Sequence, residues 1–303
     1  MQKDHKTKQL KAIGGVLIRF LLLLGIGIVL YNAQWTTLHW EKIQWVNLTP
    51  ILMAVLLIPI NFNLEWSRYK LAMQESTSAD QLRWSFYQGT VASFFTPQLL
   101  ASTLGRMKME NAQFNTQVVN AAVYTGLAQF IVTLGFACLG SAFILLERFP
   151  SVFIVFLFVL TLGIWVYFKF DFIFGVLKKI FPKWKFEVNM ASPFKGKLVG
   201  LSIIRYLVFS VQFHLIFISF GGDFSLLSVL VLMLSYGLIT LSPSILFGKI
   251  VIRETIAVAV FSFFGFPPEV ILVTSFLTWL MNVVIPVIFA MIMMNLRWQS
   301  TFS

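Results

Sequence analysis

Residues 114–146 read FNTQVVNAAVYTGLAQFIVTLGFACLGSAFILL and residues 151–168 read SVFIVFLFVLTLGIWVYF, and neither stretch contains a charged side chain. A helix needs about 20 mostly apolar residues to cross the hydrocarbon core of a bilayer. The 303-residue chain as a whole has 58% hydrophobic and 12% charged residues. Soluble domains average about 45–50% and 25%. Because the mean hydropathy is +0.84, we predict an all-α polytopic membrane protein.

Working outward from these two stretches, we predict further spanning helices with the same apolar character. The full set of six comprises residues 13–31, 49–66, 114–146, 151–168, 198–220 and 268–296. The first of them follows a basic segment, as a secretion signal does. Its length and the lack of a small-x-small cleavage site favour a retained helix.

Two further apolar regions, 82–105 and 224–264, are interrupted near their middles. The breaks fall at Thr96-Pro97 and at Ser242-Pro243. Proline removes a backbone donor and clashes with the preceding helical turn, and such a break inside a membrane requires surrounding protein or a water-filled cavity. Each region is therefore predicted to form a re-entrant helical hairpin. The alternative for each is a kinked helix that spans the membrane.

The basic residues are distributed unequally between the predicted loops. With the N-terminus inside and both hairpins returning to the side from which they enter, the inner segments sum to +11 and the outer loops to −2, and the residues at membrane depth sum to +2, which gives the net charge of +11. This asymmetry follows the positive-inside rule. We therefore expect a bacterial inner-membrane protein with both termini in the cytoplasm, and we do not interpret the charge as a sign of nucleic-acid binding.

The longest inner segment, 169–197, is rich in lysine. Within it, the stretch from Asp171 to Phe186 alternates aromatic and aliphatic residues with four lysines, a pattern that suits a helix lying in the membrane interface. A solvated connector that sets the topology explains the composition equally well.

The two interrupted regions resemble each other. Each has a proline break that is followed by a glycine and then an arginine: Pro97, Gly105 and Arg106 in the first, and Pro243, Gly248 and Arg253 in the second. Because the two hairpins are predicted to enter from opposite sides, residues 49–146 and 198–296 form approximate inverted repeats, with 151–168 as a linker helix. Many transporters are built from such repeats.

Short polar motifs occur in order along nearly the whole chain. They are Asn61 to Glu65, Arg68 to Lys70, Gly89, Phe95 to Pro97, Gly105-Arg106, Gly126, Gln129, Thr133, Arg205 to Gln212, Ser242-Pro243, Arg253-Glu254, Trp279 to Asn282 and Pro286. In these motifs the chain resembles the flippase-like family that is related to the transmembrane region of lysylphosphatidylglycerol synthase, in its stand-alone bacterial form. The resemblance implies a protein that moves a lipid or lipid-linked molecule between leaflets.

The chain also departs from that family. Leu99 and Ala101-Ser102 occupy places where the family typically carries Arg and Gly-Glu, and the usual glycine-rich turn after the second proline is reduced to Gly248, with Lys249 beside it. These differences leave the lipid cargo open. We expect no lysyl-lipid synthesis, because no aminoacyl-transfer domain is attached.

Arg253 and Lys249 lie four residues apart and therefore on one helix face, in a region predicted to lie at membrane depth. A charged side chain there costs at least a few kcal/mol and is usually placed for a purpose. The pair could bind a lipid phosphate, with Arg253 providing a bidentate fork and Lys249 a mobile charge. Alternatively, Arg253 forms an ion pair with Glu254 or Glu65.

Three more charged residues are candidates for the same substrate-binding site. Arg106 either faces the cavity or anchors the chain at the inner interface, and Arg205 either faces the cavity or extends to the interface. Glu65 either accepts a proton during transport or pairs with an arginine, which is the preferred role. The remaining polar residues of the apolar helices are expected to bond neighbouring helices: Gln129, Gln212, His214 and Asn282.

Several kinds of chemistry lack their sequence motifs. The chain has no phosphate-binding loop of the Gly-x-x-x-x-Gly-Lys-Ser/Thr type, no His-Glu-x-x-His and no Gly-x-Ser-x-Gly. The single cysteine, Cys138, excludes an internal disulfide. We therefore predict a lipid flippase that is not an enzyme, with no metal or other cofactor, acting on an anionic phospholipid or polyprenyl phosphate. The alternatives are a membrane-embedded enzyme acting on a lipid phosphate and an assembly partner of an envelope synthase.

Overall fold

In a computed structural model, residues 47–73, 78–95, 98–107, 112–180, 192–242 and 248–302 are described, and they form helices without any strand. The all-α prediction is therefore confirmed for this part of the chain. The helices are α2 (Thr49–Ala72), α3 (Ala79–Phe95), α4 (Gln98–Arg106), α5 (Ala112–Ile144), α6 (Pro150–Ile180), α7 (Ser192–Ser219), α8 (Leu226–Leu241), α9 (Gly248–Phe263), α10 (Pro268–Trp279), η3 (Leu280–Val284) and α11 (Ile285–Phe302). The span predicted at 13–31 lies outside the described residues.

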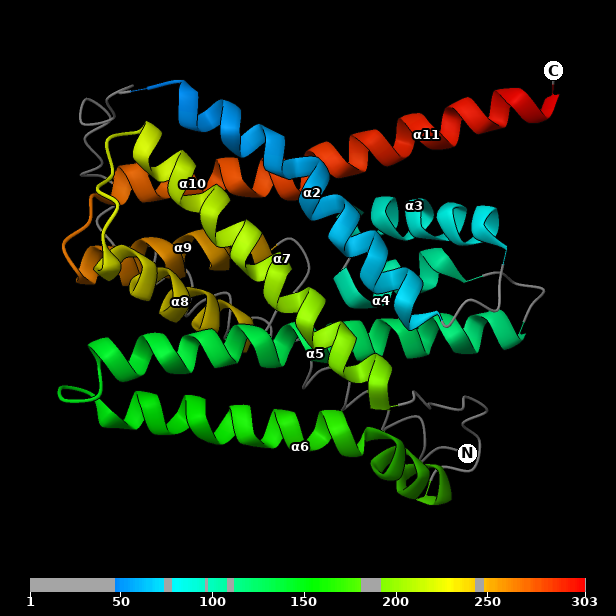
Figure 1. The fold of residues 1–303 in the computed structure, drawn as a ribbon, viewed down its shortest axis with the longest axis horizontal. Coiled ribbons are helices and arrows are strands. Elements are labelled where there is room, and N and C mark those ends of the chain that lie inside the picture. Colours follow the sequence, from blue (N-terminus) through cyan, green and yellow to red (C-terminus); the bar gives the residue numbers. More distant parts are fainter. Residues whose placement is uncertain are drawn as a thin grey trace, which may run out of the picture.

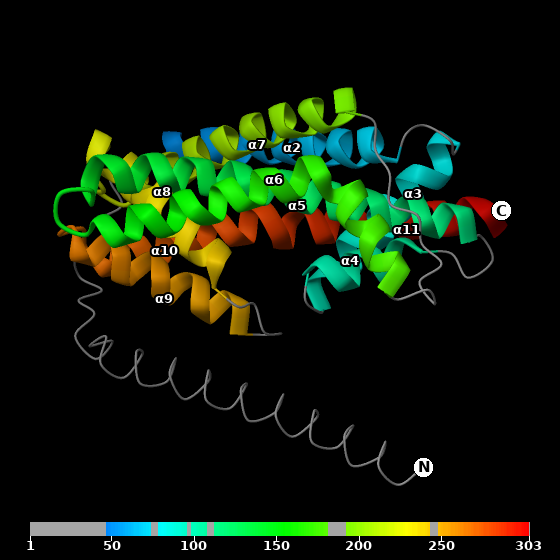
Figure 2. The ribbon, with the colours of Figure 1, turned by 90° about the horizontal axis from the view of Figure 1, so that it is seen from below.

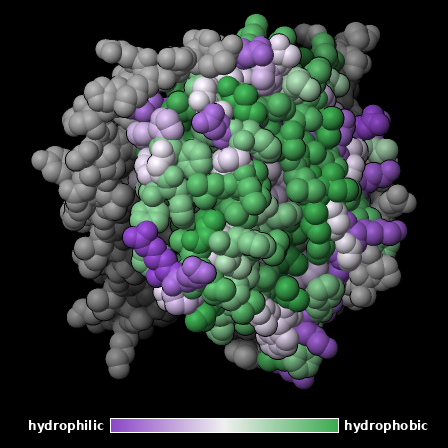
Figure 3. Space-filling model, turned by 60° about the vertical axis from the view of Figure 1, so that its left-hand side comes forward, coloured by the Kyte–Doolittle hydropathy of each residue, from purple (hydrophilic) through white to green (hydrophobic). Residues whose placement is uncertain are grey.

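Five helical segments are long and apolar enough to cross a membrane. They are Thr49–Ala72, Phe114–Ile144, Pro150–Val176, Phe194–Ser219 and Pro268–Leu296. Each overlaps one of the six predicted spans, and the number of helices that cross the membrane stays a prediction. Figure 3 shows a broad hydrophobic face whose hydrophilic residues gather mostly at its margins, as expected where lipid covers the surface. The chain is thus a multi-pass membrane protein.

The first interrupted region folds back on itself. A methyl group added at Gly105 of α4 would lie 2.5 Å from the Cβ of Ala92 and 3.0 Å from the carbonyl oxygen of Gln88, so α4 packs antiparallel to α3. Nine residues of α4 extend only about 14 Å, far less than the roughly 30 Å hydrocarbon core. The region is therefore a helical hairpin, and the kinked spanning helix is excluded. The turn with Pro97 lies outside the described residues.

The second interrupted region is also divided into two helices. The helices α8 and α9 pack against each other, and with 16 residues each they extend about 24 Å. Pro243 falls within 243–247, which the structure does not describe. Figures 1 and 2 place α3 and α4 toward one end of α5 and place α8 and α9 toward the other. The hairpins therefore approach the centre of the molecule from opposite ends.

Three connections lie together at the end that carries the second hairpin. The guanidinium of Arg148, between α5 and α6, is 6.0 Å from the ring of Phe263 at the end of α9. The ring of Phe266, which precedes α10, is 5.9 Å from that of Phe217 at the end of α7. If the α8–α9 hairpin returns to the side from which it enters, the loops α5–α6, α7–α8 and α9–α10 are expected at the same end of the protein, as they are here. Which membrane face this end occupies stays a prediction.

The lysine-rich segment differs from the expectation. We predicted a separate interfacial helix or a connector from Asp171, but α6 continues without interruption to Ile180. Asp171 is fixed to two other spans, because it accepts hydrogen bonds from the hydroxyl of Tyr124 and, at 2.6 Å, from the ammonium of Lys195. Residues 181–191 lie outside the described part.

The apolar core of the described part contains three clusters, two of which are the larger and concern the site. One contains the buried rings of Tyr69, Phe86 and Tyr167 around α2, α3, α5 and α6. The other contains Phe213 and Phe261, around α7, α8, α9 and α10. Between the two clusters lies the site described below, which both of them border.

Cysteine labelling can test the arrangement of the loops. Cys138 is the only cysteine and is buried, so Cys138→Ala provides a background for single substitutions. In sealed vesicles, we expect an impermeant maleimide to label Arg148→Cys and Phe263→Cys from one side and Lys179→Cys from the other. Labelling of residue 263 from the same side as residue 179 would mean that the second hairpin crosses the membrane.

Candidate functional site

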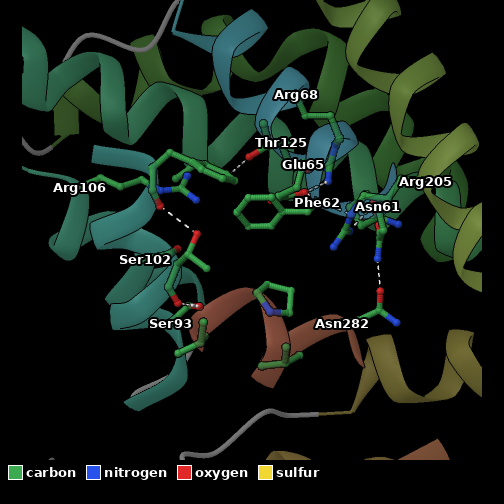
Figure 4. A pocket seen from close by; sticks show the side chains of 18 of the residues that line it. Asn61, Phe62, Glu65, Arg68, Ser93, Ser102, Arg106, Thr125, Arg205 and Asn282 are labelled. Atoms are coloured by element: carbon green, nitrogen blue, oxygen red, sulfur yellow. Dashed lines mark hydrogen bonds and ion pairs between the residues drawn. The ribbon is translucent and has the colours of Figure 1, made fainter. Parts of the chain in front are cut away.

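A cavity of about 650 Å³ lies between helices α2 to α5 on one side and α7, α8, η3 and α11 on the other. It is lined from α2, α3, α4, α5, α7, α8, η3 and α11, and therefore from both hairpins. Figure 4 shows charged and amide side chains pointing into it. The polar side chains that line it are Asn61, Glu65, Arg68, Thr90, Ser93, Ser102, Arg106, Thr125, Gln129, Thr133, Arg205, Thr240 and Asn282. A polar interior thus lies inside a protein whose outer surface is largely apolar.

Helix α2 contributes one polar stripe. Asn61, Glu65 and Arg68 are spaced by four and then three residues, which places them on one helix face. A guanidinium nitrogen of Arg68 lies 2.7 Å from a carboxylate oxygen of Glu65. A second guanidinium nitrogen of Arg68 donates to the backbone carbonyl of Thr125 on α5 at 2.6 Å. With its side chain only 2% exposed, Arg68 is a buried link between α2 and α5.

The same carboxylate oxygen of Glu65 also faces Arg205 of α7. Its distance to the Nε of Arg205 is 3.3 Å, and Arg205 donates a hydrogen bond to the side-chain oxygen of Gln129 at 3.2 Å. One acid therefore serves two arginines from different helices. This confirms the predicted pairing of Glu65, the cavity-facing position of Arg205 and the bond from Gln129 to a neighbouring helix.

Arg106, the last residue of α4, is held by aromatic rings. Its guanidinium carbon is 4.3 Å from the ring centre of Tyr69 and 5.6 Å from that of Phe86, a cation–π arrangement. Gly89 leaves room for it, because a methyl group there would come within 2.5 Å of the Cγ of Arg106. The residue is 7% exposed and does not anchor the chain at the interface.

No described carboxylate lies within ion-pair distance of Arg106. Its Nε is buried and has no hydrogen-bond partner in the described part of the chain. The Nε atoms of Arg68 and Arg205 are also buried without a hydrogen-bond partner, so Arg106 differs from them only in having no described carboxylate within ion-pair distance. A buried positive charge without a counter-ion costs free energy, and an anion bound in the cavity would reduce that cost. The guanidinium faces the cavity opposite Glu65 (Figure 4).

Three amide side chains form a chain of hydrogen bonds at another wall. Asn61 donates to the side-chain oxygen of Asn282, Asn282 donates to that of Gln212 at 2.6 Å, and Gln212 donates to the carbonyl of Ala54 at 3.0 Å. Gln212 and Asn282 therefore connect neighbouring helices, as predicted. His214 contacts the carbonyl of Ser210 within α7, and its ring centre also lies 5.3 Å from that of Phe224, which precedes α8.

Asn282 lies in a short π-helix, Leu280–Val284, between α10 and α11. Proline at 286 cannot donate to the carbonyl four residues before it, which is that of Asn282. The chain instead forms a wider turn in which the amide of Ile285 bonds the carbonyl of Leu280. Such π-bulges are frequent at functional sites. Here the wider turn directs Asn282 toward the cavity.

The structure brings together some of the predicted site residues and not others. Glu65, Arg106 and Arg205 line the cavity. Arg253 does not; it pairs with Glu254, donates to the carbonyl of Ser275 at 3.4 Å, and thus adopts the ion-pair alternative. Gly248 begins α9, whereas the side chain of Lys249 lies outside the described part.

Arg68 is the charged residue of the cavity lining that the sequence did not indicate as a site residue. The predicted span ends at residue 66 and leaves Arg68 outside it, but α2 continues to Ala72. The spacing of Asn61, Glu65 and Arg68 was the available signal, since it continues one polar face by almost another turn.

Fold and site together define a multi-pass α-helical membrane protein with an internal basic cavity. Among the described residues, no group of three or more His, Cys, Asp or Glu side chains could hold a metal ion. No family model, curated protein or solved structure matches the chain. The resemblance to the flippase-like family therefore stays a prediction that depends on the motifs quoted above.

Proposed function

We propose that this protein translocates an anionic lipid, or a lipid-linked molecule of the polyprenyl-phosphate type, between the leaflets of a bacterial inner membrane. The observation that carries the proposal is Arg106, a buried guanidinium that faces the cavity without a carboxylate partner among the described residues. A buried positive charge is costly unless an anion compensates it. A phosphate group is well suited because guanidinium binds it with two parallel hydrogen bonds.

The cavity offers an anion a path through the apolar part of the protein. Arg68, Arg106 and Arg205 provide three positive charges against the single negative charge of Glu65. Their side chains replace the water that a phosphate loses when it leaves the headgroup region. The hydrocarbon chains would meanwhile stay in contact with lipid or with apolar side chains.

Glu65 holds two of these arginines while the site is empty. Because Arg68 and Arg205 both face the same carboxylate oxygen, an incoming phosphate competes with Glu65 for Arg205, which is the more exposed of the two, at 29%. In this mechanism Glu65 compensates Arg68 and Arg205 before the lipid binds, and the phosphate then supplies the negative charge that Arg106 lacks.

The hairpin arrangement supports alternating access as a working mechanism. The helices α3–α4 and α8–α9 approach from opposite ends of α5, as discontinuous helices do in transporters with inverted repeats. We propose that movement of one half against the other opens the cavity to each leaflet in turn. The cytoplasmic placement of both termini follows from the positive-inside rule.

Reconstitution into liposomes tests the proposed function. Purified full-length protein is incorporated with fluorescent analogues of anionic, zwitterionic and polyprenyl lipids, and dithionite then quenches the outer leaflet selectively. We expect protein-dependent loss of the protected inner-leaflet signal for anionic lipids, and a much slower loss for phosphatidylcholine. Equal protection in liposomes with and without protein, for every lipid, would contradict translocation.

A further inference from the structure

A second cavity of about 440 Å³ adjoins the basic one. It lies between α2, α3 and the α11 segment and is lined mainly by rings, including Trp66, Tyr87 and Phe289. The two cavities share Ile58, Phe62, Phe86 and Pro286 in their walls. A polar, positively charged space and an apolar, aromatic groove thus lie side by side.

Phe62 stands between the two spaces. Its ring centre is 5.3 Å from that of Phe86 and 5.6 Å from that of Phe289. Figure 4 shows this ring projecting from α2 toward the centre of the basic cavity. A change of its side-chain rotamer would therefore alter the separation between the cavity and the groove.

The groove opens on the outer surface of the protein. Phe289 is 44% exposed and Ile285 is 36% exposed, and both lie in the apolar span Pro268–Leu296. The exposed Arg83 of α3 lines the groove as well. The hydrocarbon chain of a lipid can thus enter the groove laterally from the bilayer. As the chain enters, the headgroup of that lipid passes near the basic side chain of Arg83.

The charges in the basic cavity favour one class of headgroup. Its four charged lining residues sum to two positive charges. A phosphate monoester carries about −1.5 to −2 near neutral pH, whereas a phosphodiester such as phosphatidylglycerol carries one negative charge. A monoester therefore balances the cavity, and a diester leaves one positive charge uncompensated in a poorly solvated place.

We propose that the two cavities together hold one lipid phosphate monoester, with its phosphate in the basic cavity and a hydrocarbon chain in the aromatic groove. This proposal rests on the proposed function and names the class of lipid that the site takes. Phosphatidic acid and polyprenyl phosphate share this chemistry. They differ in the chain that the groove must accept.

Binding to the full-length wild-type protein in detergent tests the headgroup. Phosphatidic acid and phosphatidylglycerol with identical acyl chains are compared by native mass spectrometry, with polyprenyl phosphate as a third probe. We expect phosphatidic acid to bind at least about tenfold more tightly than phosphatidylglycerol, a difference of about 1.4 kcal/mol. Equal affinities would overturn the monoester assignment. Stronger binding of polyprenyl phosphate would identify an isoprenoid as the preferred chain.

Photo-crosslinking in nanodiscs tests the position of the chain. Phosphatidic acid with a diazirine in its acyl chain should label α2 and α11 near Phe62 and Phe289. An excess of unlabelled phosphatidic acid should reduce that labelling several-fold. Phe158 of α6, which is 67% exposed, reports ordinary lipid contact and should be labelled without such competition. If unlabelled phosphatidic acid reduces labelling of the groove no more than it reduces labelling near Phe158, the hydrocarbon chain does not occupy the groove.

Failure of the proposed lipid site and failure of the proposed transport function give different experimental results. Selective, competed binding without translocation in liposomes would contradict the proposed function but leave the lipid site in place. Translocation with equal affinity for both headgroups would leave the function in place and contradict this site. An Arg106→Gln variant should lose the preference for the monoester. Arg148→Gln, which removes an exposed arginine far from the cavity, should keep it.

Discussion

Replacing Arg68 with Gln is expected to lower the free energy of unfolding by about 3 kcal/mol. Removing one partner of a buried ion pair typically costs about 3–5 kcal/mol, because the other charge stays behind. The lower end applies here, since Arg205 still faces Glu65 and the carboxylate is 33% exposed. The bond to the carbonyl of Thr125 is lost as well. Reversible unfolding in mixed detergent micelles measures the change.

A double variant separates the lost pair from a general loss of packing. In Arg68→Gln/Glu65→Gln the stranded carboxylate is absent, so we expect a substantial part of the stability to return. Arg148→Gln makes the same chemical change at an exposed position and should alter stability by less than about 0.5 kcal/mol. If Arg68→Gln is as stable as the wild type, or if Glu65→Gln brings no recovery, the shared carboxylate does not hold these helices together.

The spans and hairpins could be predicted because they depend on local properties of the sequence. Apolar length determines which segments cross a membrane, and proline interrupts a helix wherever it occurs inside one. For this reason 114–146 is close to the helical segment Phe114–Ile144, and 151–168 lies within the longer segment Pro150–Val176. The break at Pro97 likewise indicated the hairpin of α3 and α4. The end of a span is less certain, because a buried charge can extend it, as Arg68 does in α2.

The grouping of charged residues could be predicted only in part, because it depends on which helix faces meet. Arg205 and Arg106 are far from Glu65 in the sequence, and the sequence left a cavity-facing and an interfacial position open for each of them, whereas both line the cavity. Membrane depth also indicated Arg253 as a site residue, whereas Arg253 pairs with Glu254, the residue next to it. A position at membrane depth indicates that a charged side chain needs a counter-charge, from the protein or from a ligand, but it does not identify which group supplies it. The resemblance to the flippase-like family and the inverted repeat stay predictions.

Replacing Arg106 with Gln is expected to slow translocation of an anionic lipid by about 10- to 100-fold while the protein stays folded. Hydrogen bonds to charged groups contribute about 1.5–3 kcal/mol, which corresponds to roughly this range of rates. The rate of inner-leaflet signal loss in the liposome assay measures the effect. Arg106→Lys keeps the charge but loses the planar fork and its stacking on Tyr69, so we expect an intermediate rate.

The same chemical change should therefore have opposite consequences at Arg68 and at Arg106. Because no described carboxylate pairs with Arg106, Arg106→Gln strands no buried anion, and its loss of stability should be limited to the cation–π contact, about 1 kcal/mol. Transport at the wild-type rate in Arg106→Gln would remove this residue from the binding site. If Arg106→Gln instead unfolds as readily as Arg68→Gln and recovers with Glu65→Gln, then Arg106 compensates that carboxylate. The cavity would then hold its arginines together through one acid, and the unpartnered positive charge that attracts a lipid phosphate would not exist.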